Sequence, residues 1–125
     1  MHSKIRSRMT GLIVLAAMIM TSSIAYAESM TWYVRSAHHE AVSLTFYSDD
    51  RDHAWPGGDQ VYILSDRQRY RYPISCRTGE KVCYGAWVRG RPDTYWGVGK
   101  DRRFGCTNCC YICDGGQTPT QVLQR

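Results

Sequence analysis

The residues of this chain that are best suited to chemistry are its six cysteines, all in its second half: Cys76, Cys83, Cys106, Cys109, Cys110 and Cys113. The last four stand at i, i+3, i+4 and i+7, a spacing that would place them on one face of an α-helix. The Gly115-Gly116 pair that follows is typical of a helix end. The other possible geometry is a knotted loop without a regular helix. Both predict a short cysteine-rich segment stapled to the rest of the domain.

Our main interpretation of these cysteines is three disulfide bonds. Cys76 and Cys83 flank a turn at 77–82, so a bond across this hairpin is geometrically reasonable. The neighbours Cys109 and Cys110 are expected to reach different partners, because a ring closed between adjacent residues is strained. Six cysteines allow fifteen pairings, and the sequence does not choose among them.

Two other uses of the same sulfurs stay open. A zinc–thiolate site usually separates its two C-x-x-C pairs by about a dozen residues or more, whereas here the two pairs touch. A redox site would use Cys106 with Cys109, or Cys110 with Cys113. Such a pair normally opens a helix in a βαβ unit, and no such unit is visible in this sequence.

An acidic loop provides a second group of candidate ligands, here for a divalent cation: Asp49, Asp50, Asp52 and His53. Carboxylate and imidazole groups are common metal ligands, and His38 and His39 of a preceding turn could join them. The loop lacks the alternating oxygens and central glycine of an EF-hand. Aspartate is also frequent in polar turns because it forms local hydrogen bonds, and this structural role is the more common one.

Three arginines suggest a binding surface. Arg67, Arg69 and Arg71 alternate along one expected strand, so they should project to the same face. Such a row could bind an anionic partner, such as an envelope polysaccharide, lipid head groups or an acidic protein surface. The alternative is a solvated edge strand on which charge opposes aggregation. Trp55, on a loop before Pro56, is the aromatic residue best placed for binding; most other aromatic residues are expected to fill the core.

The chain carries no recognisable catalytic motif. It has no Gly-x-Ser-x-Gly, no phosphate-binding loop and no zinc-protease helix. Nothing in the spacing of its serines and histidines pairs a nucleophile with a base. We therefore expect neither an enzyme activity nor a cofactor.

The elements that must position these groups are short β-strands, expected at 31–36, 41–48, 61–65, 69–76, 81–89 and 94–100. Apolar and polar residues alternate in several of them, as with Trp32 and Val34 in the first, which is the pattern of a half-buried strand. Pro73 indicates an edge strand or a bulge, and Gly97 a bulge or the close approach of another backbone. Turn residues separate the strands at regular intervals. The sequence therefore predicts an all-β fold, a small antiparallel sandwich or barrel.

Residues 1–27 have the features of a secretory signal peptide. Lys4, Arg6 and Arg8 precede an apolar run at 11–20 that is too short to span a bilayer, and a small-x-small cleavage site ends at Ala27. No second long apolar run follows, so we expect no transmembrane anchor after cleavage. We expect a secreted or periplasmic protein, because export would also bring the cysteines into an oxidising compartment.

Cleavage would leave a single domain at 28–116 and a flexible polar tail at 117–125. The loss of three basic residues lowers the formal net charge from +5 to +2, so nucleic-acid binding is not expected. The sequence thus predicts a small exported binding module, stabilised by disulfides, whose partner is a protein, a polysaccharide or another anionic ligand. An envelope thiol-redox or metal–thiolate protein, and a secreted toxin or inhibitor, are the alternatives.

Overall fold

The computed structural model describes residues 16, 19 and 27–124, and nearly all of its ordered elements are β-strands. The expected signal peptide lies almost entirely outside these residues. The strands are β1 (Ala27–Ser36), β2 (Val42–Ser48), β3 (Ala54–Trp55), β4 (Tyr62–Leu64), β5 (Arg69–Arg77), β6 (Lys81–Val88), β7 (Arg91–Gly97), β8 (Cys110–Ile112) and β9 (Gln117–Leu123), with one 3₁₀ turn, η1 (Lys100–Arg102). None of the described residues forms a helix long and apolar enough to cross a bilayer.

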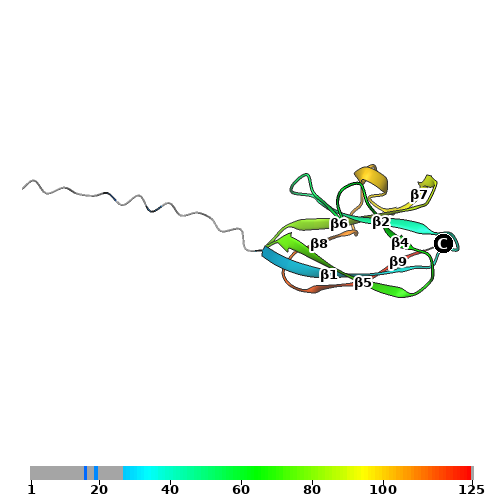
Figure 1. The fold of residues 1–125 in the computed structure, drawn as a ribbon, viewed down its shortest axis with the longest axis horizontal. Coiled ribbons are helices and arrows are strands. Elements are labelled where there is room, and N and C mark those ends of the chain that lie inside the picture. The colour runs from blue at the N-terminus through cyan, green and yellow to red at the C-terminus, as the bar shows by residue number, and fades with distance from the viewer. Residues whose placement is uncertain (1–15, 17–18, 20–26, 125) are drawn as a thin grey trace, which may run out of the picture.

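Two sheets pack face to face, as Figure 1 shows. One has three strands in the order β5-β1-β9. The other has six: β2 and β6 pair at its centre, β3 and β4 both pair with β2, and β7 and β8 both pair with β6. The all-β sandwich expected from the sequence is therefore confirmed, and it is not a closed barrel. Pro73 lies in β5 at the edge of the smaller sheet, where its missing N–H costs no ladder hydrogen bond.

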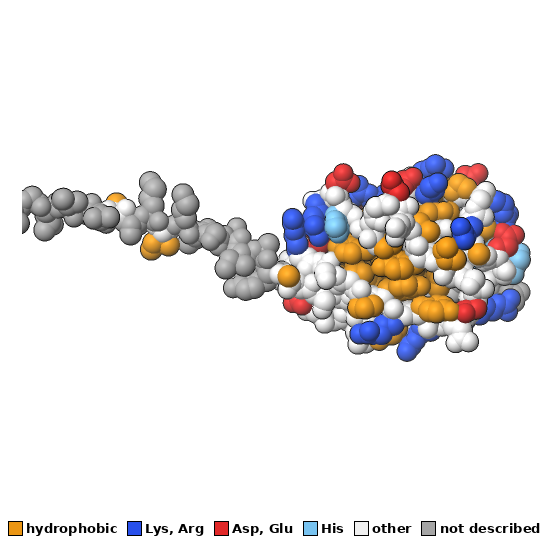
Figure 2. All heavy atoms as spheres, viewed as in Figure 1, with side chains coloured by type: hydrophobic (Ala, Val, Ile, Leu, Met, Phe, Trp, Pro, Cys, Tyr) orange, Lys and Arg blue, Asp and Glu red, His pale blue; other side chains and the backbone are white. Residues whose placement is uncertain are grey.

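The core lies between the two sheets. It is built from the side chains that point inward from the strands. Trp32 and Val34 of β1 face it, as the sequence pattern predicted; Met30 of the same strand faces it as well, and all three are almost fully buried. Trp32 packs on Phe46 of β2 with ring centroids 4.9 Å apart. Figure 2 shows hydrophobic side chains gathered in a band between the two sheets, with basic side chains around it.

Strand β2 differs from its prediction, because all seven of its residues are buried instead of every second one. The outward side chains of Thr45 and Tyr47 are covered by two later segments, the loop at 52–61 and the turn η1. The backbone N–H of Asp101 donates a hydrogen bond to the Tyr47 hydroxyl at 2.9 Å. These two segments therefore cover part of the outer face of the larger sheet. A hollow remains between them.

The polar tail expected at 117–125 is instead ordered over most of its length. Residues 117–123 form β9, which runs parallel to β1 and completes the smaller sheet. Thr118 and Leu123 are buried, and the indole N–H of Trp96 in β7 donates to the Gln124 carbonyl at 2.8 Å. The sequence reasoning weighed only the polarity of this segment, and the pairing with β1 that orders it joins residues far apart in the sequence.

The cysteine-rich segment is a loop followed by β8, so of the two geometries considered the helix is wrong. Three disulfides join Cys76 to Cys113, Cys83 to Cys110 and Cys106 to Cys109. Cys109 and Cys110 reach different partners, as expected, but the bond considered possible between Cys76 and Cys83 does not form. Those two cysteines lie on β5 and β6, which belong to different sheets, so the chain between them crosses the sandwich and is not a tight hairpin.

Glycines allow the backbone of the segment 97–99 to approach that of β6 closely. A Cβ atom on Gly97 would lie 2.1 Å from the carbonyl oxygen of Tyr84, which confirms the close approach expected there. A Cβ atom on Gly85 would lie 2.1 Å from the carbonyl oxygen of Gly99. Side chains at either position would push the segment that carries η1 away from the sheet.

Candidate functional site

The outer face of the smaller sheet carries a group of arginines that we call the arginine face: Arg35, Arg69 and Arg71. Arg35 of β1 stands directly opposite Arg69 of β5, and Tyr33 stands opposite Arg71. The inward neighbours of Tyr33 and Arg35 on β1 are fully buried, so these two residues point outward. The Arg69 guanidinium lies 4.6 Å from the centroid of the Tyr33 ring, a cation–π contact that holds the arginine over the sheet.

No carboxylate of the described residues forms an ion pair with these arginines. In the described part of the chain, the ion pairs join other residues, and none links Arg35, Arg69 or Arg71 to a carboxylate. Like charges directly opposite each other on a sheet are destabilising. The arginine face is therefore a concentrated positive surface that the fold maintains at some cost in stability.

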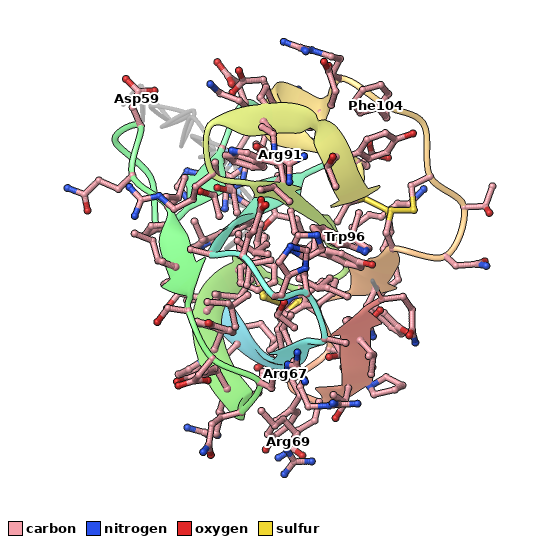
Figure 3. The ribbon with its side chains drawn as sticks, turned by 90° about the vertical axis from the view of Figure 1, so that its right-hand side faces the viewer. Asp59, Arg67, Arg69, Arg91, Trp96 and Phe104 are labelled. Atoms are coloured by element: carbon pink, nitrogen blue, oxygen red, sulfur yellow. A yellow bond between two sulfur atoms is a disulfide. The ribbon has the colours of Figure 1, made fainter. Side chains whose placement is uncertain are left out.

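Only part of this face could be found in the sequence. Arg69 and Arg71 do alternate along β5, but Arg67 precedes the strand and lies in the exposed turn before it. Figure 3 shows Arg67 and Arg69 at the same end of the molecule. Arg35 was missed, although the alternation around Trp32 and Val34 already pointed it outward. The sequence does not show the pairing register of β1 and β5, which places Arg35 opposite Arg69.

The four candidate metal ligands of the acidic loop are used in separate ways. The Asp50 carboxylate accepts a hydrogen bond from the Lys81 backbone N–H at 2.8 Å, and the Asp49 carboxylate lies 3.5 Å from the Lys81 ammonium. Asp52 borders the hollow on the larger sheet, and the ring of His53 packs against Trp55. Across residues 27–124, no three histidine, cysteine or acidic side chains converge as a metal site would require.

Trp55 lies in the interior of the sandwich and is only 8% exposed. Its indole N–H donates to the backbone carbonyl of Ser75 at 2.8 Å, which ties β3 of the larger sheet to β5 of the smaller one. The indole face is therefore not accessible for stacking on a ligand. The sequence interpretation placed Trp55 on an open loop, and the structure gives it a packing role.

A buried carboxylate that the sequence analysis did not single out organises the acidic loop. Glu80 is 3% exposed and accepts hydrogen bonds from the Ser48 hydroxyl at 2.6 Å, from the Arg77 backbone N–H at 3.0 Å and from two nitrogens of the Arg51 guanidinium. The Arg51 hydrogen bonds, with those from Ser48 and the Arg77 backbone, lower the pKa of Glu80 to about 2. Glu80 therefore stays ionised and fixes the loop to the β5–β6 turn.

None of the six cysteines is a free thiol, because all six are paired in disulfides. A metal–thiolate site would require at least two of these bonds to be reduced. The Cys76–Cys113 bond links β5 of the smaller sheet to the residue after β8 of the larger one, and Cys83–Cys110 joins directly opposed residues of β6 and β8. The Cys106–Cys109 bond closes only a short loop, and its Cys109 sulfur lies 3.7 Å from that of Cys110.

Comparison with known proteins identified no relative of this chain. The chain shows no significant similarity to any family model, curated protein or solved structure. Its function must therefore be argued from its own surfaces.

Proposed function

We propose that this protein is an exported, disulfide-stabilised module that acts by binding, and that its arginine face recognises an anionic ligand. The observation that carries the proposal is the placement of Arg35 directly opposite Arg69 with no carboxylate paired to either in the described part of the chain. Two opposed cations cost stability when the face is empty. An anionic group lying between them would offset that cost and gain charge-assisted hydrogen bonds from both guanidinium groups.

The shape and chemistry of the face favour an extended polyanion such as an acidic polysaccharide. A sheet surface is broad and open, so several negative groups of one chain could reach it together. Guanidinium groups bind carboxylate, sulfate and phosphate through paired, planar hydrogen bonds. The contact with the Tyr33 ring restrains Arg69, so less side-chain freedom would be lost on binding. The three disulfides agree with an oxidising compartment, where such polymers are found outside the cell.

The test compares two double variants that remove the same charge from different surfaces. Arg35→Gln/Arg71→Gln disrupts the arginine face and leaves the contact between Arg69 and Tyr33 intact. Arg89→Gln/Arg103→Gln removes two exposed arginines from outside that face. Binding to heparin, used as a polyanion probe, is measured by calorimetry at two salt concentrations. We expect the first variant to bind at least about tenfold more weakly and the second to bind like the wild type.

Stability separates this role from a structural one. Because Arg35→Gln removes a like-charge pair, the first variant should fold as stably as the wild type or more stably, by about 0.5 kcal/mol. If both double variants lose heparin binding equally, the interaction follows net charge alone and the arginine face is not the site.

Export is checked by the mass of the secreted protein, which should begin at Glu28.

A further inference from the structure

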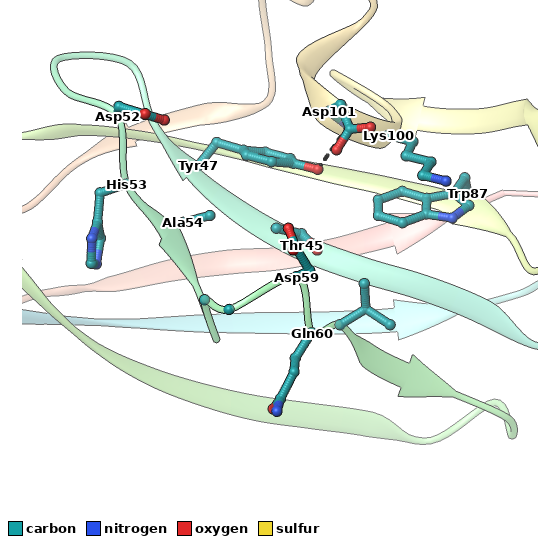
Figure 4. A pocket seen from close by; sticks show the side chains of 13 residues that line it. Thr45, Tyr47, Asp52, His53, Ala54, Asp59, Gln60, Trp87, Lys100 and Asp101 are labelled. Carbon is teal, nitrogen blue, oxygen red and sulfur yellow. Dashed lines mark hydrogen bonds between the residues drawn. The ribbon is translucent and has the colours of Figure 1, made fainter.

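The turn η1 borders two hollows on the larger sheet. One lies between η1 and the loop at 52–61 (Figure 4). The second has a volume of about 480 Å³, within the roughly 300–1,000 Å³ typical of small-ligand sites. We call it the sulfur hollow, because residues of two disulfides line it: Cys83, Cys106 and Cys110. A small molecule that enters it meets both of these disulfides.

The two disulfides are also in contact with each other. The Cys109 sulfur of one bond lies 3.7 Å from the Cys110 sulfur of the other. Disulfides exchange when a thiolate attacks one of their sulfur atoms, so a thiolate on Cys109 would have a second disulfide directly within reach. The Cys76–Cys113 bond is placed differently, because both of its residues are at most 4% exposed and neither is among the described residues that line the sulfur hollow.

Cys106 and Cys109 differ in their access to a thiol from outside. Cys106 is partly exposed and lines the hollow, whereas Cys109 is only 1% exposed and packs in a small apolar cluster with Tyr47 and Val98. An external thiolate can therefore attack Cys106, and the negative charge is then left on Cys109. A buried charge without water is costly, so the Cys109 thiolate should react with the neighbouring disulfide instead of persisting.

We propose that the sulfur hollow is a thiol-exchange site, in which the Cys106–Cys109 bond passes electrons from a low-molecular-weight thiol to the Cys83–Cys110 bond. In the first step the external thiolate bonds to Cys106, and the Cys106–Cys109 bond breaks with its electron pair on Cys109. In the second step the Cys109 thiolate bonds to Cys110. Cys83 leaves as a thiolate and takes a proton from water.

A second external thiol completes the exchange. Its thiolate attacks the external sulfur of the mixed disulfide, so that a small disulfide leaves and Cys106 becomes a thiolate. Cys106 then attacks Cys109, which restores the Cys106–Cys109 bond and frees Cys110. This last step is favoured because a ring closed between the adjacent Cys109 and Cys110 is strained. The sum is balanced: two thiols become one disulfide, and Cys83–Cys110 gains two electrons and two protons.

The charges around the hollow set no strong preference among small thiols. Two cations and two carboxylates line it: Lys81, Arg102, Asp49 and Asp101. The site is also separate from the arginine face, because Figure 3 shows Phe104, which lines the hollow, and Arg69 at opposite ends of the molecule. The exchange site does not rest on the proposed function, and the failure of either proposal leaves the other standing.

The first test follows the wild-type protein with reduced glutathione as the probe thiol. Samples are quenched with acid and alkylated, and tandem mass spectrometry locates each thiol and each mixed disulfide. We expect glutathione to appear first on Cys106. One oxidised glutathione per protein should then form, with new thiols at Cys83 and Cys110, while the Cys76–Cys113 bond stays intact. A first adduct on Cys83 or Cys110, or no adduct on Cys106, would overturn the proposal.

The second test removes the bond that passes the electrons on. In Cys106→Ala/Cys109→Ala, glutathione must attack the Cys83–Cys110 bond directly, so its reduction should be at least about tenfold slower than in the wild type. If the Cys106–Cys109 bond served only stability, its loss would loosen the domain, and the reduction would be faster. The matched control Thr107→Ala/Asn108→Ala changes two exposed residues of the same loop and should behave like the wild type. An equal or faster reduction in the cysteine variant would refute the exchange, and if that variant does not fold, the first test decides.

Discussion

Replacing Glu80 with glutamine should remove about 3 kcal/mol of folding stability at pH 7. The network around this carboxylate lowers its pKa from 4.5 to about 2, and a pKa difference of one corresponds to about 1.4 kcal/mol of preference for the ionised form in the folded state. Glutamine keeps the shape of the side chain but carries no charge to hold Arg51 and Ser48. In a domain of about this size, the loss corresponds to a fall in melting temperature of roughly 15 °C.

The pH dependence gives the sharper signature. Because the pKa of Glu80 is lower in the folded state, its contribution to stability is complete above the unfolded value near 4.5 and disappears as the pH falls toward 2. A protonated Glu80 and the glutamine of the variant are both uncharged, so the two proteins should approach equal stability near pH 2. The wild type should therefore lose stability steeply between about pH 5 and pH 2, and Glu80→Gln should lose less.

Urea unfolding followed by tryptophan fluorescence at several pH values measures both effects. The matched control is Glu40→Gln, which removes a carboxylate from an exposed ion pair with Arg91. Exposed ion pairs contribute little, so this variant should follow the wild-type curve. If Glu80→Gln and the wild type differ by a constant amount from pH 7 to pH 2, the stabilisation does not come from the charge of Glu80 and the reasoning fails.

Two further predictions concern the disulfides and a close backbone contact. Loop-closure entropy predicts that Cys76→Ala/Cys113→Ala costs about 4 kcal/mol and Cys106→Ala/Cys109→Ala about 2 kcal/mol, because the bonded residues are 37 and 3 positions apart. Urea unfolding of both variants measures the difference, and equal losses would contradict it. Gly85→Ala places a methyl group 2.1 Å from a backbone carbonyl oxygen and should cost about 2–3 kcal/mol. An unchanged melting temperature would contradict this prediction, because it would show that the segment around Gly99 moves away from β6 at no cost in stability.

The strands that could be predicted from the sequence are those marked by a pattern of neighbouring residues. Alternation of period two marked several of the strands and pointed Trp32 and Val34 inward, and Pro73 indicated an edge strand or a bulge. Such patterns depend on neighbouring residues only, so no knowledge of distant partners is needed. The same information could not show that β2 is covered on both sides, because the residues that cover it come from segments far along the chain.

The candidate sites depended on contacts between distant residues, and there the sequence was a weaker guide. Arg35 belongs to the arginine face only because β1 pairs with β5 in one register, across 34 positions of sequence. Trp55 was predicted to be an accessible loop residue, and its hydrogen bond to Ser75 instead joins the two sheets. Glu80 was predicted only as part of a turn, and its importance arises from Arg51 in another loop.

The sequence alone determined the chemical character of this protein: an all-β domain rich in cysteine, without a recognisable catalytic motif, and with outward arginines on an edge strand. These features follow from residue type and short-range spacing, which the unfolded chain already possesses. Only the tertiary structure decided which cysteines pair and which arginines face each other. Those outcomes depend on how the two sheets stack and register, and this packing is set by the whole core at once.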